Sequence, residues 1–312
     1  MAFASTLVHN HRARRLVTSD AIDVKFGILP PYGLGPIEEP GYATAFARMV
    51  EEAGFESIWV VEHVVMAVEY DSVYPYDPSG RTPFDAHTVQ PDPLIWLSHV
   101  AAATTRIRLA TGVLILPQRN PLILAKELAS LDRLSGGRVE LGIGVGWVRE
   151  EAEAVGSDFG SRGKRADEYV NVMRTLWREP VASFDGAYVK FDRMVSAPRP
   201  VQEGGVPIVV GGHSPAAARR AGRLGDGFFP LGVMPNRMKE LRELMTHEAD
   251  AAGRDAAAIE ITTVASPDAQ GLAYCRALGA DRMIVAANRG DLDGLREFID
   301  RFRNDVMLTE TP

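Results

Sequence analysis

Apolar residues recur in short runs along the chain, and the stretches between the runs follow a different spacing. Eight runs have the apolar, often β-branched character of buried strands, at residues 24–29, 57–62, 107–116, 138–146, 207–211, 226–231, 260–265 and 282–287. Between most of them, apolar residues return at three- and four-residue intervals, which is typical of amphipathic helices. Strands that are apolar on both faces and alternate with helices indicate a parallel sheet buried beneath a helical layer.

Several of the expected helices have recognisable ends. Asp92 predicts a helix over 94–104, because aspartate caps helix starts well. Asn120 predicts a second helix in the same way, and Gly136 predicts its end. We also expect a helix through 169–177, helices near 236–252, 269–278 and 291–303, and a small hairpin at 184–191.

The eight strand runs favour a (β/α)8 TIM barrel of the α/β class over a doubly wound open sheet. An open sheet that binds a dinucleotide carries its glycine-rich turn after the first strand, whereas here GIGVG (142–146) follows the fourth. Residues 23–312 show no internal repeat or linker, so we expect a single domain with insertions in its strand–helix loops. The longest insertion, 64–91, is rich in Tyr, Asp and Pro and predicts a functional lid or a disordered segment.

Residues 1–22 have a different character. Arg14 and Arg15 are followed by LVTSD and not by an apolar stretch, so neither a secretory nor a twin-arginine signal is formed. We interpret this segment as a flexible N-terminal arm or a start-site extension. His9 and His11 lie in it without a third ligand nearby, and we expect no metal site there.

The composition excludes several classes of protein and makes some partners unexpected. With 46% hydrophobic and 24% charged residues among 312, the chain can bury a large core, which excludes fibrous and disordered proteins. Its net charge of −7 argues against nucleic acid as a partner. The single cysteine, Cys275, cannot form an internal disulfide and suits a reducing cytoplasm. No run of about 18 apolar residues occurs, so we expect no membrane span.

In a TIM barrel the active site forms where the strands end, so the residues that close each run are the candidates. The fifth run ends in Gly211 and Gly212, and His213 and Ser214 follow, with Ser214 a good helix cap. Backbone N–H groups and the positive end of a helix dipole would then face the mouth, as a phosphate site requires. The same residues also suit an ordinary tight turn, so both interpretations stay open.

The fourth run ends with glycine at alternate positions, in GIGVGW (142–147). Gly144 and Gly146 would let a flat ring lie against the strand ends, with Val145 between them and Trp147 as a wall of the pocket. The alternative is that these glycines serve packing of the barrel and that Trp147 belongs to the core at its rim.

His63 closes the second run, where an imidazole can donate a proton or hydrogen-bond an anionic ring; a structural histidine is the alternative. Glu62 beside it either orients His63 or lies in the barrel as a satisfied carboxylate. No His-x-His pair on a strand and no clustered carboxylates occur, so a metal site is not expected. The G-x-S-x-G motif of serine hydrolases is absent from the sequence.

The segments 104–151 and 198–230, which contain these motifs, resemble the bacterial luciferase-like monooxygenase superfamily and, within it, the coenzyme F420-dependent oxidoreductases. The likeness covers nearly all of the chain from residue 24. It implies a (β/α)8 barrel, usually a homodimer, that binds F420 or a flavin such as FMN at the carboxyl-terminal mouth. It also implies hydride transfer between F420 and a small organic substrate, with the protein supplying orientation and a proton donor.

Compared position by position, the resemblance puts His63 near the reactive edge of the cofactor ring, with Glu62 as the second candidate catalytic residue. It implies a bulge with a non-prolyl cis peptide bond beneath the ring, near Thr111, Gly112 and Val113.

The remaining cofactor contacts are expected at two places. The resemblance implies that the cofactor tail runs along Gly144, Val145 and Gly146, next to Trp147 as the expected wall of the pocket, and that Gly211 to Ser214 hold its phosphate. Trp147 stands where the sugar-phosphate dehydrogenases of the superfamily have a glutamate, and Glu62 stands where they have an aspartate. Both departures argue against sugar-phosphate oxidation.

Two other functions stay open from the sequence. One is a two-component monooxygenase of the same fold that uses FMNH2 and oxygen. The other is a protein that binds the cofactor without turnover.

Overall fold

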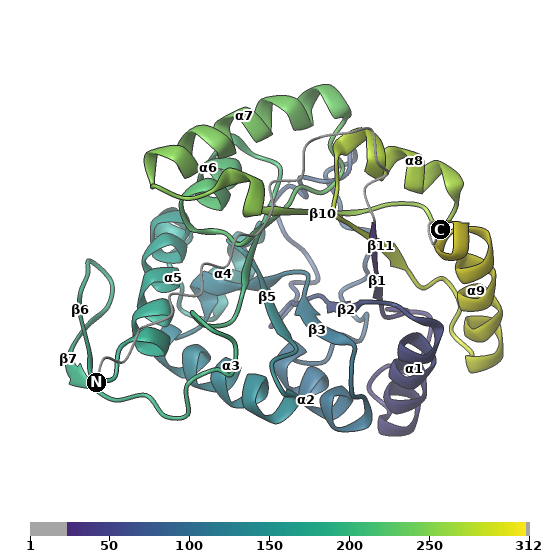
Figure 1. Ribbon diagram of the computed structural model, residues 1–312, viewed down its shortest axis with the longest axis horizontal. Coiled ribbons are helices and arrows are strands. Elements are labelled where there is room, and N and C mark those ends of the chain that lie inside the picture. The colour runs from purple at the N-terminus through teal and green to yellow at the C-terminus, as the bar shows by residue number, and fades with distance from the viewer. Residues whose placement is uncertain (1–23, 310–312) are drawn as a thin grey trace, which may run out of the picture.

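Eight parallel strands close into a barrel, and helices surround it on the outside (Figure 1). The computed structural model describes residues 24–309. The barrel strands are β1 (Lys25–Leu29), β2 (Ser57–Val60), β3 (Arg108–Thr111), β5 (Val139–Gly144), β8 (Ile208–Gly211), β9 (Gly227–Phe229), β10 (Glu260–Val264) and β11 (Arg282–Ala286). β1 pairs with both β2 and β11, and β3 pairs with both β2 and β5, so the ring has no open edge. The predicted (β/α)8 barrel is therefore confirmed.

The helices follow the strands in the expected order. They are α1 (Pro40–Ala53), α2 (Pro93–Ala103), α3 (Pro121–Ser135), α4 (Arg149–Ala154), α5 (Arg162–Arg178), α6 (Pro215–Leu224), α7 (Pro235–Ala251), α8 (Ala269–Leu278) and α9 (Leu292–Asp305). Asp92 and Asn120 cap α2 and α3 as predicted, each accepting two backbone N–H bonds. Gly136 ends α3 in the left-handed conformation, with φ of 72°. No helix among residues 24–309 is both long and apolar enough to cross a membrane.

The predicted hairpin is confirmed, whereas the predicted role of the long insertion as a lid or a disordered segment stays a prediction. The hairpin consists of β6 (Ala182–Asp185) and β7 (Lys190–Met194), which pair antiparallel on the outside of the barrel. The long insertion 64–91 contains neither helix nor strand. The proposed arm, residues 1–22, lies outside the described part of the chain, together with His9 and His11.

The third strand differs from its prediction as one run. β3 ends at Thr111, and the short strand β4 (Leu114–Ile115) resumes the pairing with β5. The peptide bond between Gly112 and Val113 is cis, at the position that the resemblance implied. The Gly112 N–H donates to the Val60 carbonyl at 2.6 Å, so the interruption stays tied to β2.

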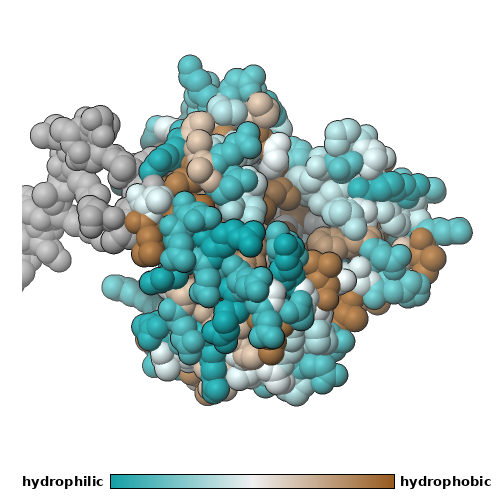
Figure 2. All heavy atoms as spheres, turned by 90° about the vertical axis from the view of Figure 1, so that its right-hand side faces the viewer, coloured by the Kyte–Doolittle hydropathy of each residue, from teal (hydrophilic) through white to brown (hydrophobic). Residues whose placement is uncertain are grey.

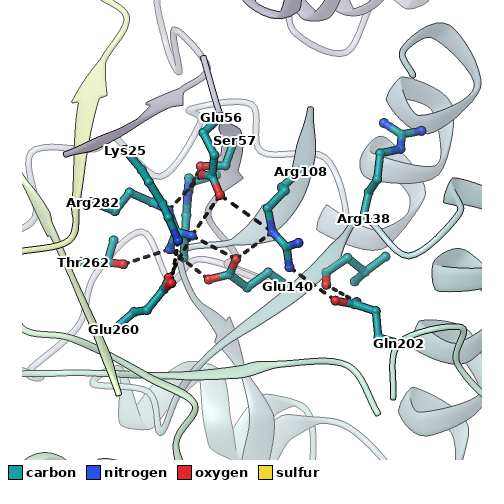
Figure 3. Close-up of polar contacts among 12 residues, drawn as sticks. Lys25, Glu56, Ser57, Arg108, Arg138, Glu140, Gln202, Glu260, Thr262 and Arg282 are labelled. Carbon is teal, nitrogen blue, oxygen red and sulfur yellow. Dashed lines mark hydrogen bonds and ion pairs between the residues drawn. The ribbon is translucent and has the colours of Figure 1, made fainter. Parts of the chain in front are cut away.

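The inside of the barrel is apolar in its middle and charged at the end where the strands begin. Trp59, Ala110, Val209, Phe229 and Ile284 form the inner apolar cluster. Beneath it the Arg282 guanidinium, only 1% exposed, donates to the carboxylates of Glu56, Glu140 and Glu260 (Figure 3). This network closes the amino-terminal end of the barrel, which leaves the opposite end for ligands.

Candidate active site

The carboxyl-terminal mouth brings together the segments that the sequence singled out, because parallel strands all end on the same side of the barrel. His63 follows β2, Val113 lies between β3 and β4, Trp147 follows β5, and His213 follows β8.

His63 is held by a buried carboxylate that sequence reasoning missed. Its Nδ1 lies 2.8 Å from Oε2 of Glu151 on α4. The other oxygen of Glu151 accepts the backbone N–H of Val64 at 2.6 Å. The Glu151 side chain is 1% exposed and that of His63 is 16% exposed. The imidazole is thus fixed through one ring nitrogen while its ring borders an open cavity.

Glu62 does not orient His63, although the two residues are adjacent in sequence. Its carboxylate accepts the backbone N–H of Ile115 at 2.6 Å and pairs with the Arg119 guanidinium, which also reaches Asp92. Burial raises the pKa of Glu62, although Arg119 and the Ile115 N–H favour its ionised form. Of the two interpretations left open for Glu62, the structure supports the satisfied carboxylate inside the fold, and the expectation that it orients His63 is corrected.

Thr111 also uses its side chain within the barrel. The Thr111 hydroxyl, 1% exposed as a residue, donates to the carbonyl of Gly142 at 2.7 Å and so joins β3 to β5. A Cβ atom at Gly142 would collide with the Thr111 carbonyl. The predicted contact of Thr111 with the cofactor therefore has to involve the Thr111 backbone and not its hydroxyl.

The glycines at the ends of β5 and β8 make room for Val113. A Cβ at Gly144 would come within 2.6 Å of Val113 Cγ2, and a Cβ at Gly211 within 2.7 Å of Val113 Cγ1. The alternate glycine spacing thus lets the interruption between β3 and β4 project its valine between two neighbouring strands. The predicted contact of Gly144 and Gly211 with a cofactor stays a prediction.

Gly146 and Gly212 have backbone conformations that favour glycine, with φ of 82° and 114°. The Gly212 N–H donates to the Phe229 carbonyl at 3.1 Å, which links the end of β8 to β9. Val145, which follows the last residue of β5 and precedes Gly146, packs in part against the core.

The turn after β8 begins α6 as the sequence predicted. Ser214 caps the helix by accepting the Ala217 N–H at 3.1 Å, and Pro215 is the first helical residue. Nδ1 of His213 is buried without a hydrogen-bond partner. Burial and the nearby Arg237 lower the pKa of His213, so its neutral form is favoured.

Aromatic side chains from the 64–91 loop cover this part of the mouth. Trp147 meets His63 edge-on at 6.1 Å between ring centres, and it contacts Tyr70 and Tyr74 at 5.5 and 5.1 Å. Tyr76 reaches His213 at 4.8 Å. The loop therefore extends from His63 across to the turn that was predicted to hold phosphate.

Helix α4 fastens the same loop through Glu150. Its carboxylate accepts the backbone N–H of Asp71 at 2.7 Å and the Ser72 hydroxyl at 2.6 Å. The Ser72 oxygen in turn accepts the N–H of Arg149 at 2.9 Å. The hydrogen bonds that the Glu150 carboxylate accepts, led by that from the Ser72 hydroxyl, lower the pKa of Glu150 to about 2. Of two consecutive glutamates in α4, Glu150 thus holds the loop and Glu151 holds the imidazole of His63.

A cavity of about 180 Å³ lies beside His63. Its walls come from the start and the end of the 64–91 loop: Val64, Val65, Met66, Phe84, Asp85, Ala86, Thr88 and Gln90. In the view that faces α8 and α9, the surface is largely hydrophilic and is hollowed at a place bordered by hydrophobic side chains (Figure 2).

Comparisons with known proteins point to the same family as the sequence motifs. The family model described as luciferase-like monooxygenase matches residues 22–268. An uncharacterized protein of Mycobacterium tuberculosis is 32% identical over 261 residues, covering 82% of this chain and 91% of the relative. The F420-dependent glucose-6-phosphate dehydrogenase of Kineococcus radiotolerans is 36% identical over 194 residues, covering 61% of this chain and 52% of the relative.

A solved structure has the same fold. The monooxygenase RslO1 from Streptomyces bottropensis superposes with a TM-score of 0.73 at 23% identity, over 92% of this chain and all of that one. At that identity the likeness concerns the fold alone. The family match, which spans most of the sequence, together with the M. tuberculosis relative, shows that this chain belongs to the luciferase-like monooxygenase family of oxidoreductases.

Proposed function

We propose that this protein is an F420-dependent oxidoreductase that transfers hydride to or from a small organic substrate at the mouth of the barrel. The observation that carries the proposal is His63, a partly buried, hydrogen-bonded imidazole after the end of β2 that borders a cavity. Similarity to F420-dependent dehydrogenases supports F420 as the cofactor.

The residues at the mouth fit a large, phosphorylated ring cofactor in two respects. His213 Nδ1 and both amide atoms of Gln118 are buried without protein partners, and buried polar groups of this kind usually have one. Gln118 lies near Gly146, and His213 lies at the start of α6, where the helix dipole favours an anion. In this proposal residues 211–214 hold the phosphate, and residues 144–147 and Gln118 border the ring and tail.

When bound, F420 would supply the carbon that accepts or donates the hydride, and the protein would supply position and a proton route. His63 fits the second task. Since Nδ1 is held by Glu151, Nε2 remains to exchange a proton with a substrate hydroxyl or a product carbonyl in the cavity. Trp147 and the loop tyrosines would exclude water from the mouth.

The cavity favours a small substrate without a phosphate group. Its volume is below the roughly 300–1,000 Å³ of sites for drug-sized ligands. The residues that line it include Asp85 but neither lysine nor arginine, so a substrate phosphate would find no cation there. This agrees with Trp147 and Glu62 in place of the residues of the sugar-phosphate dehydrogenases.

A flavin monooxygenase that uses FMNH2 is the alternative, supported by the fold likeness to a monooxygenase. A cofactor-binding protein without turnover is the second alternative. We also propose a homodimer, as the resemblance implies, and sedimentation of the purified protein tests that part on its own.

Turnover assays separate these functions. The proposal expects F420-dependent oxidation or reduction of small uncharged alcohols, ketones or similar compounds, without oxygen consumption and without activity on glucose 6-phosphate. Oxygen uptake that requires FMNH2 and a substrate would support the monooxygenase. Cofactor binding with no redox change across the panel would support the protein without turnover.

A further inference from the structure

Glu151 is a buried carboxylate whose two oxygens are both engaged at the mouth. Oε1 accepts the N–H of Val64 and Oε2 lies 2.8 Å from Nδ1 of His63. The carboxylate is 1% exposed, and buried charge of this kind is retained only where its hydrogen bonds are satisfied. Removing either bond would leave a buried oxygen without a partner.

These contacts select one form of the imidazole. The Val64 N–H can only donate, so Glu151 accepts at Oε1, and an ionised carboxylate can only accept at Oε2 as well. Nδ1 of His63 must then carry the proton of this hydrogen bond. In the neutral ring, Nε2 is left as the lone-pair nitrogen, and it is the atom free to exchange a proton with a ligand.

The contacts around the pair limit rotation of the ring. Trp147 packs edge-on against His63, with the ring planes at 90°. Glu150, next to Glu151, ties α4 to Asp71 and Ser72 of the loop that begins at residue 64. The segment 147–151 therefore contacts His63 through both Trp147 and Glu151, and it fastens the loop that follows His63.

We propose that Glu151 is a positioning residue that holds His63 in the Nδ1-protonated tautomer and presents Nε2 to the substrate. The inference about the tautomer stands on the contacts alone. Its consequence for turnover rests on the proposed function, so the two are tested separately.

The first test needs neither cofactor nor substrate. Long-range ¹H–¹⁵N NMR of the imidazoles at about pH 8, where an ordinary histidine is neutral, reports the tautomer of each of the seven histidines. His63→Gln assigns the signal by its loss. We expect His63 to be mainly Nδ1-protonated in the full-length protein, and a mainly Nε2-protonated ring would overturn the proposal.

Glu151→Gln tests the cause. The Val64 N–H still needs an acceptor, so the glutamine oxygen would take the place of Oε1 and its NH2 group would donate to Nδ1 of His63. The proposal therefore expects His63 to shift toward the Nε2-protonated tautomer while the other histidine signals stay in place. Glu153→Gln is the matched control, because Glu153 lies on the same helix with its side chain 59% exposed. An unchanged His63 tautomer in a folded Glu151→Gln variant would contradict the proposal. If that variant does not fold, the wild-type spectrum still tests whether His63 is Nδ1-protonated.

The second test concerns turnover with F420 and a substrate found in the panel above. We expect Glu151→Gln to lower kcat by roughly 10–100-fold, the range found when hydrogen-bond partners that orient metal-bound imidazoles are removed, with KM changed little. Glu153→Gln should keep the wild-type values. A change in KM alone would contradict the positioning role, whereas an absence of any wild-type turnover would count against the proposed function and leave the NMR result standing.

Discussion

Val113 lies so close to Gly144 that a methyl group on the glycine would come within 2.6 Å of its Cγ2 atom. We therefore predict that Gly144→Ala destabilises the protein by about 1–3 kcal/mol, the usual cost of forcing extra atoms into a packed region. Valine is branched at Cβ and has few alternative rotamers, so it cannot easily withdraw. Urea unfolding monitored by circular dichroism measures the change.

A second variant and a control make this prediction specific. Val113→Ala removes the opposing methyl groups, so the double variant should be more stable than the sum of the single changes predicts. Gly41→Ala, in α1, has no atom within 4 Å of the added methyl group and should be neutral or slightly stabilising. Additive costs in the double variant would show that Val113 is not the obstacle.

Arg282 is predicted to be the most costly side chain to remove from the closed end of the barrel. Arg282→Met would leave the carboxylates of Glu56, Glu140 and Glu260 without the cation that they share. Breaking a buried ion pair from one side costs about 3–5 kcal/mol. Chemical unfolding near pH 7 measures the loss, and Arg296→Met on the exposed face of α9 is the control. A loss below about 1 kcal/mol would contradict the role of this network.

Stability should fall in acid partly because of Glu56. Burial alone would raise its pKa, but Arg282, Ser57 and Arg108 together outweigh burial and lower it. A carboxylate with a lowered pKa in the folded state stabilises the fold above its unfolded pKa of about 4.3 and loses that effect as pH falls through the folded value. We expect the unfolding free energy to decline less steeply below about pH 4.5 in Glu56→Gln than in the wild type. Parallel pH profiles for the two proteins would argue against this assignment.

The loop over the mouth should open more readily when its attachment to α4 is weakened. Ser72→Ala removes the hydroxyl that donates to Glu150 and accepts from Arg149. A hydrogen bond contributes about 0.5–1.5 kcal/mol, equivalent to roughly a two- to tenfold change in the opening equilibrium. Limited proteolysis should cleave within 64–91 faster by that factor, while cleavage in the hairpin 182–194 stays unchanged. Equal rates in both proteins would mean that Ser72 does not hold the loop.

Local sequence signals are sufficient to predict the barrel fold. The eight apolar runs, the caps at Asp92, Asn120 and Ser214, and the glycine at the end of α3 each depend on neighbours within a few residues. The break between β3 and β4 was not visible in the apolar pattern, because Gly112 and Val113 are compatible with a continuous strand. Its expected position came from the family resemblance.

The chemistry of the site depended on contacts that local patterns do not encode. His63 and Glu151 are 88 positions apart, and only closure of the barrel brings them together. Helix α4 has six residues, too few to show helical periodicity, so its glutamates had no recognisable setting in the sequence. Glu62 was the expected partner because it is adjacent, but successive residues near a strand end point in different directions.

Comparison of the affinities for the two cofactors tests the central claim most directly. Calorimetric titration of the purified protein with F420 and with FMN, under the same conditions, gives both dissociation constants. The proposal predicts that F420 binds at least tenfold more tightly, a difference of about 1.4 kcal/mol. Tight binding of FMN with no measurable affinity for F420 would contradict it.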